Sequence, residues 1–357
     1  MFPTSAASDR ALWRYKPAMD MRLLARFWHP VAQSSDLARR PLERTVCGRK
    51  LVVFRDREGR AQILDARCPH RGANLARGKV VDGGIECPYH GWRFDGSGRC
   101  VRIPTQPCRV PSGFSVRAYP AIESQGFLWT SVADDSPIGE VPRFDALDQP
   151  GLRRFVVEEE IAAPFDWWME NVLDVAHVPF THKLTYGGKP AAIDRFSVER
   201  RADDLGFSAR TELRQDYGLL ARLLHGSLGE LALSIRLEHW MPGATLFDVD
   251  VGAGHQRRVQ RLLFLTTPVD ANRSRVWIAV YRNYLRFSLG DLIGKLFARA
   301  IISEDMRIAN SAVERNPMAM RGRLNAAVDE PSIEMMRLMS RWAERIEAED
   351  RGGDLAG

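Results

Sequence analysis

The chain has 357 residues, 45% apolar and 27% charged, which is typical of globular proteins and excludes disordered, collagen-like and disulfide-scaffold proteins. Its longest apolar runs fall far short of the roughly 18–20 residues that cross a bilayer, so we expect no membrane span. The 51 basic and 45 acidic residues are interleaved, and the net charge of +6 therefore does not predict nucleic-acid binding.

Length and cysteine usage set two further expectations. A chain of this length predicts two domains. Five cysteines, an odd and low number, together with no apolar signal core in residues 1–20, predict a reducing, cytoplasmic location. A cysteine with a chemical role is then expected to bind metal or act as a nucleophile, and Cys47, Cys100 and Cys108 are interpreted as packing residues.

The first 145 residues read as β-rich. Three hairpins are predicted, each from two short apolar runs that flank a turn containing Gly with Asp, Ser or Glu. The paired runs are 50–56 with 61–66, 92–94 with 99–103, and 115–119 with 127–132. Short strands at this spacing indicate a small antiparallel sandwich or barrel. Residues 133–152 are rich in Asp, Pro and Gly, and we expect the domain boundary there.

The second half combines strands with helices. Strands are predicted at 195–213, 232–251 and 256–284, and the last run folds back at 270–274. Helices are predicted at 164–178, 288–314 and 332–349. Strands followed by helices near the end of the chain are the α+β pattern.

Two short loops contain the first set of metal-binding residue types. Residues 68–72 read Cys-Pro-His-Arg-Gly and residues 87–92 read Cys-Pro-Tyr-His-Gly-Trp. Each loop supplies one thiolate and one imidazole, while its Pro stiffens the backbone and its Gly allows a tight bend. Two such loops from adjacent hairpins can face each other and enclose an inorganic centre.

Two kinds of centre fit these four ligands. A zinc site would place Cys68, His70, Cys87 and His90 around one ion, although zinc fingers usually pair like residues within each half. The mixed halves suit a [2Fe–2S] cluster in which the two cysteines bind one iron and the two histidines the other.

The segment 170–182 contains the second set. On a helix Asp174 and His177 would share a face, whereas His177 and His182 would point about 140° apart. We expect Pro179 to stop the helix near Val178, so that the chain turns and the two imidazoles converge. Two histidines need a carboxylate from elsewhere to complete the 2-His-1-carboxylate set that binds Fe(II).

Both sets together resemble the motifs of Rieske non-haem iron oxygenases. The pattern N-x-x-D-x-x-H-x-x-x-x-H matches Asn171, Asp174, His177 and His182. The resemblance implies a third iron ligand, an Asp on a distant helix, and we choose Asp305 with Glu304 as the alternative. It also implies that Asp174 links a Rieske histidine of one subunit to an iron-binding histidine of the next, in a head-to-tail homotrimer.

The resemblance covers nearly the whole chain. It implies an N-terminal extension at 1–24, an all-β Rieske [2Fe–2S] domain at 25–145 and a mononuclear-iron catalytic domain of helix-grip shape at 150–347. The motifs look most like the vanillate-demethylase-like and chlorophyllide- or pheophorbide-oxygenase-like branch. The implied activity is that of a terminal oxygenase that hydroxylates or oxidatively demethylates an aromatic or polycyclic compound. The alternative is a cis-dihydroxylating dioxygenase of a multicomponent system.

Electrons must then come from another protein. The chain has no strand–GxGxxG–helix unit, so a separate NAD(P)H-dependent reductase or ferredoxin is expected. A Rieske electron carrier and a zinc-stabilised binding module are the competing interpretations from other classes. Six apolar residues are candidates for a substrate cavity, though each is more commonly core: Leu219, Leu220, Leu223, Leu224, Phe247 and Phe264.

Overall fold

A computed structural model describes residues 20–37, 40–106, 109–187, 193, 196–215, 231–251, 258–314 and 323–353. Within these ranges no helix is both long and apolar enough to cross a membrane. Leu219, Leu220, Leu223, Leu224, Cys108 and most of the expected N-terminal extension lie outside the described residues. Cys47 and Cys100 pack against hydrophobic clusters, in agreement with their interpretation as packing residues.

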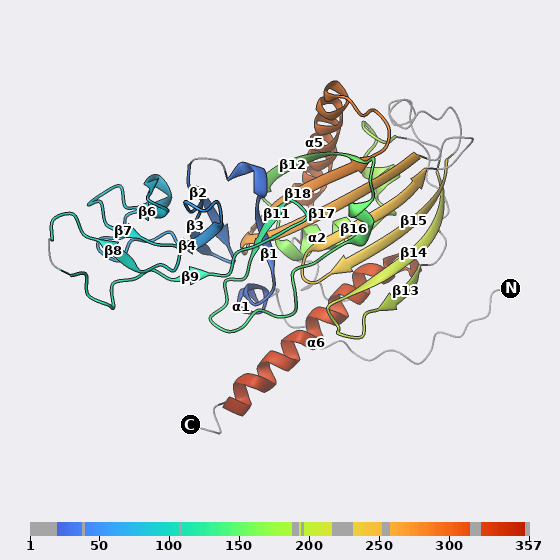
Figure 1. The fold of residues 1–357 in the computed structure, drawn as a ribbon. Coiled ribbons are helices and arrows are strands. Elements are labelled where there is room, and N and C mark those ends of the chain that lie inside the picture. The colour runs from blue at the N-terminus through green and yellow to red at the C-terminus, as the bar shows by residue number, and fades with distance from the viewer. Residues whose placement is uncertain are drawn as a thin grey trace.

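The N-terminal part consists of three small antiparallel sheets, which lie to the left in Figure 1. The first has the order β1-β11-β10, with β1 His29–Gln33, β10 Ile122–Ser124 and β11 Phe127–Thr130. The second is β2-β3-β4-β9: Leu42–Val46, Arg49–Arg55, Ala61–Asp65 and Ala118–Tyr119. The third is β5-β6-β7-β8: Lys79–Val81, Gly84–Glu86, Arg93–Phe94 and Cys100–Arg102.

Two of the three predicted hairpins are confirmed, and the third is wrong. β3 pairs with β4, and β7 pairs with β8. However, β9 pairs with β4, while β11 pairs with β10 and β1. The residues Gln125 and Gly126 both have positive φ, 48° and 80°, which makes them the two-residue turn that favours a tight β10–β11 hairpin. Strand β11 therefore pairs with β10, its neighbour in the sequence, and not with β9, as the predicted hairpin required.

A seven-stranded antiparallel sheet forms the rest of the molecule, in the order β12-β18-β17-β16-β15-β14-β13. The strands are β12 Arg153–Ile161, β13 Ser197–Arg200, β14 Gly206–Gln215, β15 Leu231–Trp240, β16 Ala244–Val251, β17 Arg258–Asp270 and β18 Arg273–Arg282. The predicted run 195–213 is therefore two strands with a turn between them. Strand β12 was not predicted, because its three consecutive glutamates hide the apolar alternation. Two of these, Glu158 and Glu160, pair with Arg275 on β18.

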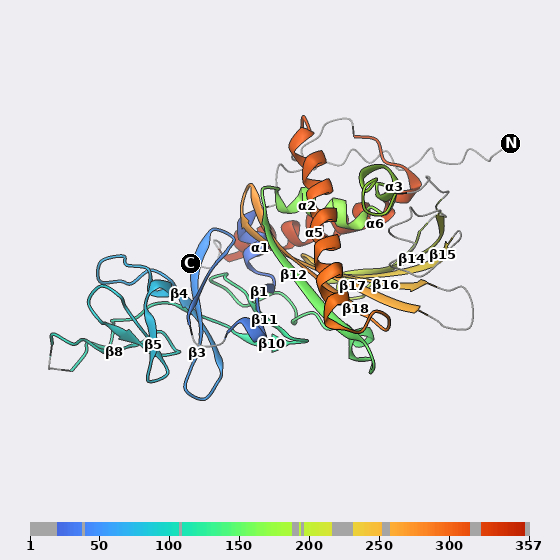
Figure 2. The ribbon, with the colours of Figure 1, turned by 90° about the horizontal axis from the view of Figure 1, so that it is seen from above.

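Each face of the large sheet is covered by a different layer. Along β18 the side chains alternate, so that Val276 and Ile278 belong to one hydrophobic cluster and Trp277 and Ala279 to another. The first cluster also contains residues of the helices α2, α5 and α6, which lie on the same side of the sheet in Figure 2. The second includes Trp129 of β11, so the N-terminal part covers the opposite face.

The helices that carry the site are α2 Phe165–Leu173, α3 Val178–Thr181 and α5 Ser288–Ser311. The last helix, α6 Glu330–Gly353, and the short α1 Met21–Ala25 are the other α-helices of the described residues. The predictions at 288–314 and 332–349 are confirmed to within a few residues. The mixed architecture of an all-β N-terminal part and an antiparallel sheet with segregated helices confirms the predicted α+β class.

Candidate metal centres and the adjoining cavity

A break in the backbone directly after α2 positions the two candidate histidines. Asp174 leaves the helical region, with φ −90° and ψ 114°, and its carboxylate accepts a hydrogen bond of 2.7 Å from the Ala176 N–H. The chain then forms the single turn of α3, with His177 as its N-cap and His182 as its C-cap. The two histidines therefore stand at opposite ends of one helical turn.

The expected position of the helix break was wrong. The first helix stops at Leu173, before His177 and not near Val178. Pro179 lies in the first turn of α3, where its missing N–H has no helical partner to lose and its fixed φ favours a helix start. The proline therefore begins the second helix. The two imidazoles converge, as expected, but because Pro179 helps to start a new helix and not because it ends the first one.

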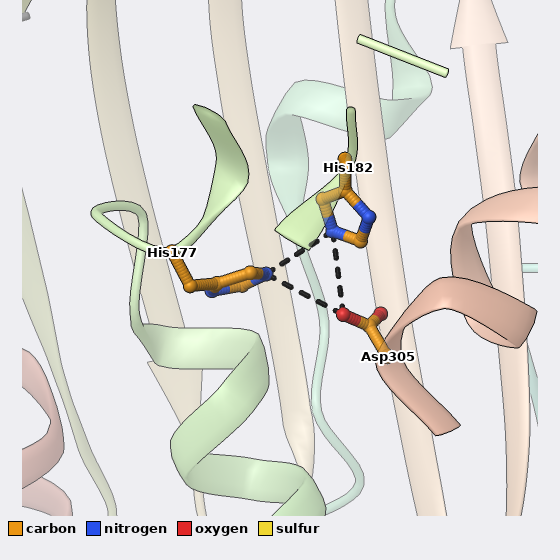
Figure 3. A group of neighbouring side chains, drawn as sticks. All are labelled: His177, His182 and Asp305. Carbon is orange, nitrogen blue, oxygen red and sulfur yellow. Dashed lines mark hydrogen bonds and ion pairs between the residues drawn. The ribbon is translucent and has the colours of Figure 1, made fainter. Parts of the chain in front are cut away.

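His177, His182 and Asp305 form a compact group between α3 and α5 (Figure 3). The two Nε2 atoms are 3.1 Å apart, and Asp305 Oδ1 lies 3.6 Å from that of His177 and 3.3 Å from that of His182. Three ligands bound to one cation at about 2.0–2.2 Å would have this mutual spacing. Asp305 Oδ1 is buried and has no hydrogen-bond partner, which fits an oxygen that faces a metal ion.

Burial shifts the pKa values of two members of this group, His182 and Asp305. Burial and the neighbouring charge of His177 lower the pKa of His182 to about 4, so its imidazole is neutral and its Nε2 lone pair is available near pH 7. Burial raises the pKa of Asp305 to about 6. A carboxylate that loses its water in this way gains most from a nearby cation, because little else stabilises its charge.

Glu304, the alternative third ligand, occupies a different position. It faces the other ring nitrogen of His182, with 3.3 Å between Oε2 and Nδ1. The Leu184 N–H and the Thr185 hydroxyl also donate to its carboxylate, at 2.9 and 2.6 Å. Glu304 therefore holds the Nδ1–H of His182 and turns Nε2 toward Asp305, the arrangement in which a second carboxylate orients a metal-binding histidine. The sequence did not predict this role.

Two other residues of the matched motif lie beside the group. Asn171 hydrogen-bonds to the Asp305 side chain and lines the same cavity. Asp174 Oδ2 lies 3.6 Å from His177 Nδ1, longer than a hydrogen bond. Burial opposes ionisation of Asp174, but the interaction with His177 outweighs it and keeps the pKa of Asp174 below its usual range. With 35% of its side chain exposed, Asp174 lies between His177 and the surface.

The two Cys-Pro loops connect β4 to β5 and β6 to β7 and have matching backbones. In each, a glycine N–H donates to the cysteine carbonyl four residues earlier, Gly72 to Cys68 at 2.9 Å and Gly91 to Cys87 at 3.1 Å. Both glycines have positive φ, 71° and 68°, which side chains rarely tolerate. The loops therefore present their side chains in equivalent ways.

Like residues meet across the two loops. The thiol groups of the buried Cys68 and Cys87 lie within hydrogen-bond distance, and the rings of His70 and His90 have centroids 4.5 Å apart. Trp92 stacks on His70 at 4.6 Å. The Nδ1 atom of His70 is buried and has no partner, which suits a ligand atom. A thiolate pair beside an imidazole pair is what a cluster with two irons requires.

A single zinc ion fits these loops less well. Four ligands at tetrahedral zinc all lie within about 4 Å of one another. Among the described residues, His177, His182 and Asp305 form the one group of three or more candidate ligands within 4.8 Å. The four loop ligands do not meet at one point, so the geometry favours the [2Fe–2S] interpretation over zinc.

A cavity of about 220 Å³ lies next to the iron-type group, enclosed by the large sheet, α2 and α5. His177, His182 and Asp305 form part of its wall. Phe247 and Phe264, for which a core position was the more common expectation, also line this cavity. Most other lining side chains are aliphatic or aromatic, which suits an apolar ligand.

A paired-loop centre and a 2-His-1-carboxylate group beside an apolar cavity define a two-centre iron protein. Comparisons with protein families agree: residues 27–120 match the Rieske [2Fe-2S] domain, and residues 161–345 match the vanillate O-demethylase oxygenase C-terminal domain. The chain belongs to the Rieske non-haem iron oxygenases, and its cofactors are a [2Fe–2S] cluster and a mononuclear non-haem iron.

Several curated proteins are similar to this chain. The putative toluene-4-sulfonate monooxygenase system iron-sulfur subunit TsaM2 of Comamonas testosteroni is 31% identical over 277 residues, covering 73% of this chain and 80% of that protein. Protein TIC 55, chloroplastic, of Pisum sativum is 35% identical over 163 residues, or 44% of this chain, but the match spans only 30% of TIC 55. The crystal structure of dicamba monooxygenase bound to dicamba superposes with a TM-score of 0.77 and 23% identity, over 93% of this chain and 100% of that one, which shows a shared fold.

Proposed function

We propose that the chain is the terminal oxygenase component of a multicomponent system, and that it uses O2 to hydroxylate or oxidatively demethylate an aromatic or polycyclic compound. The observation that carries this proposal is the 2-His-1-carboxylate group in the wall of an apolar cavity, in a chain that also has the paired Rieske loops. A Rieske electron carrier would need neither the group nor the cavity.

We assign the cluster ligands to the two loops. Cys68 and Cys87 hold one iron, and His70 and His90 hold the other. The two imidazoles are the more exposed pair, which suits electron entry and exit on their side. Replacing two thiolates by neutral imidazoles raises the reduction potential of such a cluster to about −150 to +300 mV.

We assign the mononuclear iron to His177, His182 and Asp305. When bound there, Fe(II) supplies the activation of O2 at its open positions. Glu304 fixes the tautomer of His182, and Asn171 orients the Asp305 carboxylate. The apolar cavity wall excludes water and holds a hydrocarbon surface against this group.

Domain limits, partners and location are part of the same proposal. The matched ranges 27–120 and 161–345 lie inside the proposed domains 25–145 and 150–347, after an extension at 1–24. An NAD(P)H-dependent reductase or a ferredoxin supplies electrons. Asp174 connects His177 to a Rieske histidine of the adjacent subunit in a homotrimer, which its partly exposed position beside His177 supports. The free cysteines support a reducing cytoplasm.

The relatives favour demethylation but support a second outcome. The catalytic range matches a vanillate O-demethylase domain, and relatives include the 5,5'-dehydrodivanillate O-demethylase oxygenase subunit of Sphingobium. The 3-chlorobenzoate-3,4-dioxygenase oxygenase subunit of Comamonas testosteroni is 33% identical over 164 residues, which favours cis-dihydroxylation as the second candidate.

Isotope labelling tests the proposal. The holoenzyme, a surrogate reductase and NADH are incubated under ¹⁸O2 with a panel of methoxylated and unsubstituted aromatic acids. All three reactions predict substrate-dependent O2 uptake: hydroxylation with one labelled atom in the product, dihydroxylation with two, and demethylation with an unlabelled phenol and formaldehyde, because the oxygen from O2 leaves in the formaldehyde and exchanges with water. Electron transfer to the cluster with neither a labelled product nor a phenol and formaldehyde from any member of the panel would contradict the oxygenase proposal.

A further inference from the structure

The cavity has a second polar region, distant from the iron-type group. It lies where β17 and β18 approach the start of α5, and the cavity-lining residues there include Gln260, Arg282 and Tyr284. Tyr284 donates a hydrogen bond to the Gln260 side-chain oxygen. These groups interrupt an otherwise apolar wall and need a separate explanation, because none contacts the iron-type group.

Arg282 is the main charged group of this region. It is 3% exposed, and its Nη2 donates to the Leu285 carbonyl at 2.7 Å and to Asp291 Oδ1 at 2.8 Å. Its Nη1 is buried and has no hydrogen-bond partner. The guanidinium also lies over the ring of Phe155, 5.1 Å from the centroid. A buried guanidinium with one nitrogen unsatisfied is costly unless a ligand completes its hydrogen bonds.

The charges around Arg282 do not cancel. Asp291 is shared with a second arginine, because Arg153 Nε donates to its other oxygen at 2.8 Å. Two guanidinium groups that share one carboxylate leave this end of the cavity positive, and an anion is the ligand that such an environment favours.

The two polar regions lie far apart along α5. Gly290, Gly294, Ala298, Ile301 and Asp305 line the cavity and occupy one face of the helix. Gly290 and Asp305 are about 22 Å apart at the helical rise of 1.5 Å per residue. Because the side chain of Asp305 leans toward the helix N-terminus by about one residue and Arg282 lies beside Gly290, roughly 20 Å separates the iron-type group from Arg282. A one-ring acid held at Arg282 cannot reach the other end.

We propose that Arg282 is a specificity-determining residue that binds the carboxylate of an elongated substrate, an apolar two-ring acid whose reacting carbon lies at the opposite end of the cavity. The inference rests on the proposed function for the identity of that reacting end. Arg282 positions the substrate and takes no part in the chemistry.

Anaerobic calorimetry on the reduced holoenzyme tests this assignment with biphenyl-4-carboxylate and its neutral analogue biphenyl-4-carboxamide. We expect the acid to bind at least about tenfold more tightly than the amide, as a charge-assisted hydrogen bond in a buried site provides. In Arg282→Gln the ratio falls to about one, while the Kd of the amide stays within about threefold. Equal affinities in the unaltered protein, or a ratio that survives the substitution, would overturn the proposal.

Two further variants separate ligand recognition from folding. Arg153→Gln leaves Asp291 to pair with Arg282 alone and does not touch the cavity, so it is expected to lower the acid-to-amide ratio, though by less than Arg282→Gln does. Asp291→Asn removes the competing carboxylate and is expected to raise that ratio. If Arg282→Gln does not fold, an unchanged or lower ratio in Asp291→Asn contradicts the role of Arg282.

Binding and turnover distinguish the two proposals. The calorimetry requires no catalysis. An acid preference without any product of the panel would therefore contradict the oxygenase proposal and support the recognition site. Labelled product without an acid preference would do the reverse. Benzoate completes the comparison, because a one-ring acid that binds as tightly as the two-ring acid would contradict the elongated substrate.

Discussion

The two metal centres of this protein are built in opposite ways. The Rieske-type loops bring together four proposed ligands from 23 consecutive positions, residues 68–90, through two tight turns with matching hydrogen bonds. The mononuclear group takes two of its proposed ligands from the ends of one helical turn and the third from α5, more than 120 positions later. The first centre is determined by local backbone geometry, and the second by how α5 packs on the large sheet. Changes at the two centres should therefore have separable effects.

Removing one proposed ligand of the mononuclear group gives the largest expected effect. The substitution His182→Ala is predicted to abolish turnover and to leave about two irons per chain, where the unaltered protein holds about three. The visible spectrum of the Rieske cluster should persist, since no loop residue changes. Iron analysis with absorption spectroscopy checks this, and a bleached protein would show that His182 serves the cluster or the fold.

The connection between the centres is the next target. For Asp174→Asn we expect unchanged iron content and a rate of electron transfer to the mononuclear site lower by about 100-fold, because the carboxylate beside His177 loses its charge. Single-turnover experiments on pre-reduced protein measure that rate. Asp145→Asn, at a fully exposed position outside the catalytic part, is a matched acidic control, and near-normal turnover in Asp174→Asn would refute the bridging role.

Glu304 should show a smaller effect confined to the mononuclear centre. Glu304→Gln is predicted to weaken iron binding by about 10- to 100-fold, since the Nδ1–H of His182 loses its charged acceptor. Chelator competition measures this affinity, and the cluster should be unaffected. Ser303→Ala, at an exposed position one residue earlier, serves as control. Loss of the cluster signal instead would mean that the two centres are not separable.

The smallest expected effect concerns the junction between the two parts. His29 on β1 is fully buried, and burial lowers its pKa to about 4 from 6.5. The unfolded chain therefore binds the proton more readily, so stability is present above pH 6.5 and is lost as pH falls toward 4, by up to about 3 kcal/mol. Urea unfolding at several pH values measures this. His29→Gln should flatten the slope, and an unchanged slope would contradict the assignment.

The sequence predicts the local features of this molecule better than the long-range ones. The tight turns of the two Cys-Pro loops could be predicted, because the cysteine, proline, histidine and glycine of each loop lie within a few residues of each other. The third hairpin was wrong because apolar runs alone do not identify a strand's partner, and the two-residue turn at Gln125 and Gly126 decided it. Strand β12 was missed because its glutamates pair with arginines of a strand far along the chain.

The same division holds within the mononuclear group. The spacing of His177 and His182 indicated convergence, yet the proline between them starts a helix instead of ending one, which depends on the backbone break at Asp174. The choice between Glu304 and Asp305 came from resemblance, and helical geometry said only that they point apart. The contacts with His182 give each carboxylate its position. The extent of the cavity, which reaches Arg282, likewise depends on how the helices pack on the sheet. Neither feature can be predicted from the order of the residues alone.

The iron-to-sulfide ratio of the purified, reconstituted holoenzyme tests the two-centre account most directly. The account predicts about three irons for two acid-labile sulfides per chain, from one [2Fe–2S] cluster and one mononuclear site. Two irons for two sulfides would leave only an electron carrier, and zinc without sulfide would contradict both centres.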